Sequence, residues 1–327
     1  MKTLYTHKKQ HQGFSLVELM IAATIGLLLM SAVISLFLSS NHSSQQTSMR
    51  SGIYENGRYA LSTMSDELKL AEFWGGAQAV EITPSDTLDA IATDCTQGAM
   101  GYDFGTGATY TYPGLWATTA TTADVVGCIS DAEVGSDVVV IKRVAEQPTA
   151  LADVDTNKTY IMSNSVTGML FDGDDTPPTT TAIGGDVPNG QAWEYIVAIY
   201  YVANNAEGIP TLFRKSLSGN TWGSVEEVAL GVEKMHLQFG VDSTGDGVAN
   251  SFRDATNAAW DDDDNYVVSA HIYLLIRSEA ENAASSDTKT YQLGSVSIGA
   301  PSDHYQRVVF DTTVNLRNLS LMAAGGF

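Results

Sequence analysis

Basic residues are scarce in this sequence. It has 17 Lys and Arg against 38 Asp and Glu, which gives a formal net charge of −21. A surface of that sign repels phosphate groups, and no local basic patch interrupts it. The composition therefore argues against direct binding of DNA or RNA.

Short catalytic motifs are also missing. The sequence contains no G-x-S-x-G, H-E-x-x-H, G-x-x-x-x-G-K-[ST] or G-x-G-x-x-G. The histidines beyond the first thirteen residues, His42, His236, His271 and His304, are widely separated. We therefore expect no enzymatic activity. A membrane-anchored enzyme or binding protein, with a site assembled from dispersed Asp, Ser and His, stays open as an alternative.

Long apolar runs are equally rare, because only residues 14–38 form one. Glu18 is the single charged residue in this run, which is long enough to span a bilayer as a helix. A secretory signal would place a small residue after its apolar core, whereas Gly13 precedes this one. Cleavage at Gly13 would leave the membrane segment attached.

The basic residues before the run indicate its orientation. Lys8 and Lys9 place this end in the cytoplasm and send the rest of the chain across the inner membrane into the periplasm. Without residues 1–13, which carry three lysines, the chain has 14 basic against 38 acidic residues, or −24.

The junction of Gly13 and Phe14, followed by Glu18, resembles the class III signal of type IV prepilins and pseudopilins. The resemblance implies that prepilin peptidase cuts between Gly13 and Phe14 and methylates the new amine of Phe14. It also implies that Glu18 attracts the N-terminal amine of a neighbouring subunit, a reason for a carboxylate that costs roughly 2.5–3.5 kcal/mol in a membrane. The alternative is an ordinary anchor whose acid lies near the interface.

The apolar pattern continues beyond the membrane segment. Between residues 39 and 74 no Pro occurs, and apolar or small residues recur at helical spacing: Ile53, Gly57, Ala60, Leu61, Met64, Leu68 and Ala71. The spacing predicts one nearly continuous helix from Phe14 to about Trp74, ended by Gly75 and Gly76. Gly52 and Gly57 leave a local kink open.

After residue 76 the sequence changes to short β-rich runs divided by Gly, Asp, Asn and Pro. Strands are predicted over residues 137–142, 193–202, 211–217, 232–241, 266–277 and 306–316, and loops over 172–190 and 261–264. The expected fold class is α+β, with the helix packed on an antiparallel sheet. The expected organisation is a leader (1–13), a membrane half-helix (14–38), an amphipathic half-helix (39–76) and a periplasmic head (77–327).

Cysteine is limited to Cys95 and Cys128. In an oxidising compartment a lone pair most simply forms one disulfide, which would hold a Gly-, Thr- and Tyr-rich excursion in place. Two free buried thiols are the alternative.

Several short sequence segments resemble those of PilW-type minor pilins of the type IV pilus. They lie at residues 58–61, 64–76, 200–202, 208–214, 231–235, 240–242 and 314–318. The chain departs from that family where a Cys often follows the first helix, since Ala77 stands there. The resemblance implies a structural subunit that primes pilus assembly at or near the tip. It also implies as partners other minor pilins, the major pilin, prepilin peptidase, the inner-membrane assembly platform and a tip adhesin. A type II secretion pseudopilin shares the signal and stays open.

A loop near residue 245 matches a calcium-binding pattern in part. With Asp242 as its first position, Thr244, Asp246 and Asn250 supply oxygens at positions 3, 5 and 9, but position 12 is Arg253. Asp254 or the acids at 261–264 would have to replace the missing ligand. The alternative is an Asp/Gly-rich hairpin turn, and otherwise we expect no cofactor.

Overall fold

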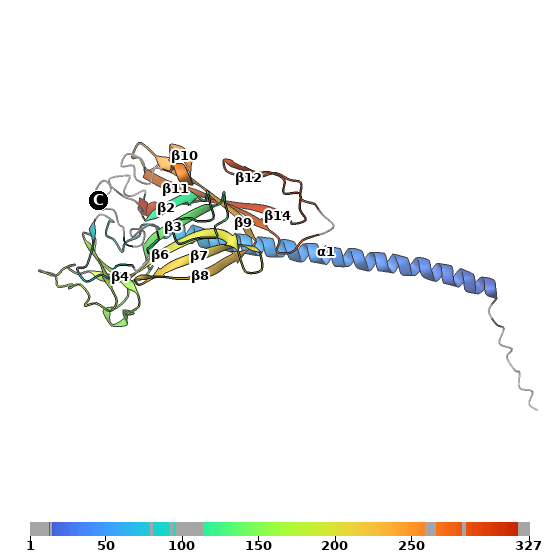
Figure 1. The fold of residues 1–327 in the computed structure, drawn as a ribbon, viewed down its shortest axis with the longest axis horizontal. Helices are drawn as coiled ribbons and strands as arrows, with labels where there is room; N and C mark the ends of the chain where they lie inside the picture. The colour runs from blue at the N-terminus through green and yellow to red at the C-terminus, as the bar shows by residue number, and fades with distance from the viewer. Residues whose placement is uncertain are drawn as a thin grey trace, which may run out of the picture. The chain divides into compact units, whose positions relative to one another are not determined.

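The computed structural model describes residues 13, 15–78, 81–91, 94–95, 102, 114–258, 266–282 and 286–319. The chain divides into two compact units, Met1–Met49 and Arg50–Phe327, and we call the second unit the head. The helix α1 (Leu16–Leu70) runs through both units, and the described strands all lie in the head. The fold is α+β and mostly strand, with a long N-terminal helix whose head portion packs on antiparallel-rich sheets (Figure 1).

The head portion of α1 carries one buried stripe. Its buried residues are spaced three or four apart, so they fall on one face of the helix: Ile53, Gly57, Ala60, Met64 and Leu68. The predicted stripe is thus confirmed, with Leu61 partly buried beside it. The helix continues through Gly52 and Gly57 without a break.

The predicted end of the helix is wrong by a few residues. We expected Trp74 as the last position, but α1 ends at Leu70, and Glu72 takes a left-handed backbone with φ 60°. The Glu72 amide then donates to the carbonyl of Lys142 at 3.0 Å. Tertiary hydrogen bonding therefore turns the chain before Gly75 is reached.

The larger sheet has the strand order β1-β5-β4-β6-β3-β2, and β7 joins β6 to the edge strand β8. The 14 residues of β6 pair with β4 near their start, with β3 in the middle and with β7 towards their end. The bounds are β1 (Ile82–Pro84), β2 (Leu115–Thr119), β3 (Asp137–Val144), β4 (Thr159–Ser163), β5 (Gly168–Asp172), β6 (Gln191–Asn204), β7 (Pro210–Ser218) and β8 (Thr221–Leu230).

The smaller sheet has the order β10-β9-β11-β14, and a separate hairpin, β12–β13, follows β11. Leu275, Tyr291 and Leu293 form a small apolar cluster between this hairpin and β11. The bounds are β9 (Val232–Asp242), β10 (Ser251–Asp254), β11 (Tyr266–Arg277), β12 (Tyr291–Leu293), β13 (Val296–Ile298) and β14 (Arg307–Asn315), with short 3-10 helices η2 (Leu151–Asp153) and η3 (Ala255–Asn257).

Two cores lie on opposite faces of the larger sheet. Along β6, Tyr200 and Val202 join the stripe of α1 and the inner face of the smaller sheet in one cluster. Ile199 and Tyr201 point the other way, into a second cluster that contains Cys95. Because both faces of β6 are covered, its sequence is almost continuously apolar.

The predicted strands are all present, with ends shifted by up to two residues. The predicted loop at 172–190 begins one residue later, because Asp172 ends β5, and the rest of it contains no strand. Strands β1, β2, β4, β5, β8, β10, β12 and β13 were not predicted. The expected antiparallel arrangement holds except that β1 pairs with β5 in parallel. The predicted loop at 261–264 lies outside the described residues.

Gly52 and Gly57 of α1 make a matched test of this packing. A Cβ at Gly57 would lie 2.5 Å from Cε2 of Phe310, whereas nothing lies within 4 Å of one at Gly52. We expect Gly57→Ala to lower the free energy of unfolding by about 1–3 kcal/mol through overpacking. Gly52→Ala should raise it by about 0.5–1 kcal/mol through helix propensity. Urea unfolding of both variants measures this, and equal effects would contradict the packing.

Candidate functional site

Glu18 lies in the first turn of α1 and forms a reciprocal cap with Ser15. The Ser15 amide donates to Oε2 of Glu18 at 2.9 Å, and the Glu18 amide donates to Oγ of Ser15 at 3.2 Å. This is the capping box, in which two amides that the helix leaves free are satisfied together. The negative charge of Glu18 also suits the N-terminal end of the helix dipole.

The processing residues flank this cap. Gly13 is exposed and non-helical, while Phe14 and residues 1–12 lie outside the described residues. Oε1 of Glu18 accepts no hydrogen bond from the described part of the chain. One carboxylate oxygen is thus engaged locally, and the other is open to a donor from elsewhere.

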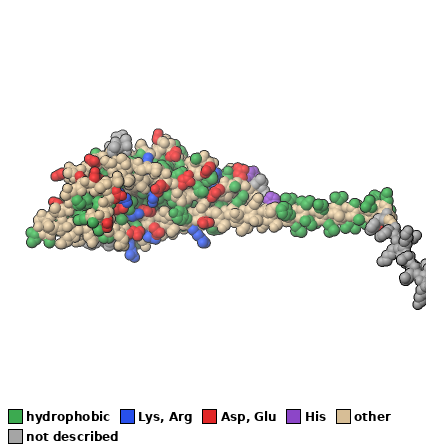
Figure 2. All heavy atoms as spheres, turned by 90° about the horizontal axis from the view of Figure 1, so that it is seen from below, with side chains coloured by type: hydrophobic (Ala, Val, Ile, Leu, Met, Phe, Trp, Pro, Cys, Tyr) green, Lys and Arg blue, Asp and Glu red, His purple; other side chains and the backbone are tan. Residues whose placement is uncertain are grey.

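The apolar run of α1 has no protein cover within its own unit. From Leu16 to Leu38 its side chains are exposed, and Figure 2 shows hydrophobic side chains on both margins of this part of the helix. Two of its hydroxyls are satisfied internally, because Thr24 Oγ1 donates to the carbonyl of Ile21 and Ser31 Oγ to that of Leu28. The helix is long and apolar enough to cross a membrane.

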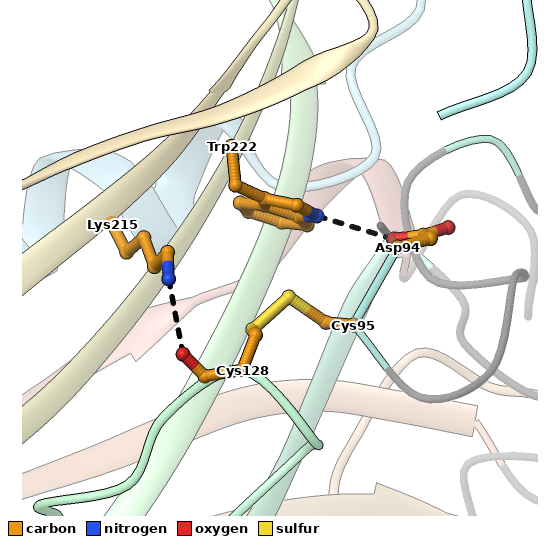
Figure 3. Close-up of a disulfide and its surroundings, with 5 residues drawn as sticks. All are labelled: Asp94, Cys95, Cys128, Lys215 and Trp222. Carbon is orange, nitrogen blue, oxygen red and sulfur yellow. Dashed lines mark hydrogen bonds between the residues drawn. A yellow bond between two sulfur atoms is a disulfide. The ribbon is translucent and has the colours of Figure 1, made fainter. Parts of the chain in front are cut away.

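The two cysteines lie in the head and are joined in a disulfide, with Cα atoms 5.1 Å apart. Cys95 precedes β2 and Cys128 follows it. Around the bond, Lys215 Nζ of β7 donates to the carbonyl of Cys128 at 3.0 Å, and Trp222 Nε1 of β8 donates to Asp94 at 3.3 Å (Figure 3). The bridge and these two contacts tie Asp94, Cys95 and Cys128 to β7 and β8 of the larger sheet.

His236 brings together dispersed residues that the sequence did not connect. Its Nδ1 lies 3.1 Å from Oδ2 of Asp137, while Nε2 lies 3.4 Å from Oδ1 of Asp254 and 3.3 Å from Oγ of Ser295. The histidine is buried, and its ring stacks on Tyr273. Four elements, β3, β9, β10 and the turn between β12 and β13, therefore meet at one imidazole.

In this cluster the serine does not donate its hydroxyl proton to the histidine, as the serine of a nucleophilic Ser–His pair would. Burial disfavours the charged imidazole, but the hydrogen bond and charge of Asp137 and the charge of Asp254 outweigh it and raise the pKa of His236. Ser295 donates its hydroxyl proton to Asp254 at 2.7 Å rather than to the histidine. Through these contacts the imidazole joins the two sheets and the β12–β13 hairpin, and we call the cluster the histidine clasp.

Of the calcium-like residues, Asp242 ends β9, and Thr244, Asp246 and Asn250 lie on the loop that leads to β10. The carboxylate of Asp242 accepts the amides of Thr244, Gly245 and Gly247, which lowers the pKa of Asp242 against the opposing effect of burial. The side-chain oxygen of Asn250 accepts the Ser243 amide.

Asp246 also bonds within the loop, since its carboxylate accepts the Val248 amide. These oxygens thus serve the backbone of the loop itself, as in an Asx turn. In the ranges that the structure describes, no group of three or more His, Cys, Asp or Glu could hold a metal ion. The acids at 261–264 lie outside those ranges, and calcium binding stays a prediction.

Removal of the disulfide should destabilise the head. We expect Cys95→Ser/Cys128→Ser to lower the free energy of unfolding by about 3–4 kcal/mol, because the bridge no longer restricts the unfolded chain. Urea unfolding measures this, and reduced wild-type protein is the control. Identical unfolding midpoints for the oxidised wild type and the double variant would contradict the assigned role.

The histidine clasp predicts a pH dependence of stability. Since the pKa of His236 is raised in the folded protein, its contribution is complete below the unfolded value of about 6.5 and is lost as the pH rises through the folded value. The free energy of unfolding should fall over this interval in wild type, and His236→Gln should flatten that slope. His271→Gln is the control that keeps it. Superimposable profiles of wild type and His236→Gln would refute the clasp.

Comparison with known families agrees with this geometry. Residues 199–318, from within β6 to just beyond β14, match the family model described as Type IV Pilus-assembly protein W. Residues 8–34 match the prokaryotic N-terminal methylation motif, and they include Gly13, Phe14 and Glu18. No curated protein and no solved structure matches the chain.

The signal and the pilus-assembly match imply a prepilin peptidase and pilin partners. The chain is therefore type IV pilin-like, because one segment resembles the pilus-assembly protein W family and another matches the N-terminal methylation motif.

Proposed function

We propose that this protein is a minor pilin that primes assembly of the type IV pilus and occupies a position at or near the tip. The observation that carries the proposal is an uncovered apolar helix with a capped carboxylate in its first turn, joined to a head with its own cores. Such a helix needs a membrane before assembly and other helices after it. The function is packing and involves no turnover.

The helix supplies the assembly surface. Before assembly its side chains from Leu16 to Leu38 contact lipid, and in the filament they contact neighbouring helices. Burial against lipid or against helices differs little in hydrophobic energy, so close packing and specific polar contacts must select the arrangement. Glu18 is the one charged group in this segment that can supply such a contact.

The proposed contact is between Glu18 and the methylated amine of Phe14 in a neighbouring subunit. Prepilin peptidase would create this amine by cutting after Gly13. Because Ser15 holds only Oε2, Oε1 stays open to the incoming ammonium without loss of the cap. An ion pair formed away from water fixes axial register through its hydrogen-bonding geometry.

The tip position is supported by the size of the head. Residues 50–327 form one compact unit with two sheets and a disulfide-fastened excursion, and a bulky head is accommodated best where no further layer of heads lies beyond it. The proposed partners are other minor pilins, the major pilin, the assembly platform and a tip adhesin. The pilus-assembly match favours this role over that of a type II secretion pseudopilin. In the proposed orientation, Lys8 and Lys9 lie in the cytoplasm and the head in the periplasm.

Two substitutions of Glu18 separate its charge from its capping role. Gln also serves at this position of a capping box, so Glu18→Gln keeps the bond to Ser15 but loses the negative charge. If Glu18 attracts an amine, both Glu18→Gln and Glu18→Ala should fail to restore piliation in cells that lack the gene. Surface pili are counted by electron microscopy and measured in sheared fractions.

The control is the processing of each variant. Intact mass should show loss of residues 1–13 and one added methyl group, dependent on prepilin peptidase, with the mature chain in the membrane fraction. Full piliation with Glu18→Gln would contradict the charge-based contact. An N-terminus that stays uncut, or is cut after residue 38, would contradict the pilin function itself.

A further inference from the structure

A cavity of about 360 Å³ opens in the head between α1 and the chain that joins β11 to β14. Its walls come from three segments far apart in sequence. Arg50 and Tyr54 belong to α1, Lys289 to the stretch before β12, and Tyr305 and Arg307 to the entry of β14. A volume of this size suits a small organic ligand.

The floor of the cavity is fixed by Arg307, whose side chain is 1% exposed. All five of its N–H donors are engaged: Nε with Glu233, Nη1 with Asp287 and Asp303, and Nη2 with Glu233 and Asp303, at 2.5–3.1 Å. Its hydrogen bonds lower the pKa of Asp303 to about 2. Arg307 therefore has no donor left for a ligand, and its role is to make the floor rigid.

The remaining acid and rings of the lining are also fixed. Asp287, the one carboxylate among the lining residues, accepts from Arg307, from the hydroxyl of Tyr291 at 2.8 Å and from the Lys289 amide at 3.3 Å. The ring of Tyr305 lies 4.0 Å from the guanidinium of Arg277. Asp287 thus offers little to a ligand, and its charge is compensated.

Four free groups of the lining can donate hydrogen bonds. Within the described chain, the Arg50 guanidinium, the Lys289 ammonium and the hydroxyls of Tyr54 and Tyr305 make no hydrogen bond or ion pair. Two unpaired cations at one cavity are unusual for a chain with 38 acids and 17 bases, in which a carboxylate is seldom far away. A site with free cations and hydroxyls, and without a free carboxylate, selects an acceptor-rich anion.

We propose that this cavity binds a small organic oxyanion, held through a carboxylate or phosphate by Arg50 and Lys289. The hydroxyls of Tyr54 and Tyr305 then bond the remaining oxygens of the ligand. Lys and Arg suit this task differently, because Arg binds an oxyanion through two parallel hydrogen bonds and Lys through a point charge. The ligand would add a binding function to a head otherwise concerned with packing.

The test uses the full chain in a neutral detergent, so that the micelle does not attract anions. Binding of glucuronate, inorganic phosphate and glucose is measured by isothermal titration calorimetry. Glucuronate and phosphate separate a carboxylated sugar from a free phosphate, and glucose lacks the charge. The variant is Arg50→Gln/Lys289→Gln. Its control is Arg58→Gln/Lys69→Gln, which makes the same change in net charge on exposed residues of α1 away from the cavity.

We expect wild type and the control variant to bind at least one of the two anions in preference to glucose. The cavity variant should bind that anion at least about tenfold more weakly, since a charge-assisted hydrogen bond contributes roughly 1.5–3 kcal/mol. Circular dichroism of both variants checks that they fold. Binding of neither anion to wild type, equal binding of glucose, or equal loss of affinity in both variants would overturn the proposal.

Discussion

The head depends on one contact, the burial of a single helical stripe against two sheets. Ala60, Met64 and Leu68 are fully buried, and they pack in one cluster with β6 of the larger sheet and β9 and β11 of the smaller sheet. The stripe lies in one cluster with residues from the inner faces of both sheets, so the helix shields part of each face from water. The second core then forms on the opposite face of the larger sheet, where Trp74, Cys95, Val125 and Ile129 from the connecting segments are among the covering residues. The same helix carries the assembly signal, so the anchor and the main core share one continuous element.

The sequence predicted those elements in which buried apolar residues recur at a fixed spacing. The stripe of α1 and the apolar strands β6, β9 and β11 are of this kind. Strand β8 was missed because most of its residues are exposed and its Glu-Glu pair resembles a loop. Strand β4 was missed because five buried residues are too few to show a period. The early end of α1 was missed because the partner of the Glu72 amide is 70 residues away in the chain, at Lys142.

The candidate sites also divide into one that is local in the sequence and others that only the fold assembles. Gly13, Phe14 and Glu18 lie within six residues, so a linear signal describes them completely. The clasp at His236 and the floor at Arg307 draw their acids from separate elements, and no spacing in the sequence connects Asp137 with His236 or Glu233 with Arg307. Strand register and the fold of the chain between β11 and β14 decide these contacts. A list of histidines and acids could therefore name the members of each cluster but not assemble it.

The exposed edge of the larger sheet has a consequence for crowded membranes. In the described chain β8 pairs only with β7, so alternate residues along its ten-residue outer edge present N–H and C=O groups without a strand partner. Glu226 and Glu227 lie in the middle of this edge, and only Glu226 has a cationic partner there, Arg214. Two copies brought edge to edge would oppose carboxylates to carboxylates, which disfavours strand pairing between chains. If the chain acts as the proposed pilin, this repulsion would keep subunits from joining their sheets while they wait in the membrane for assembly.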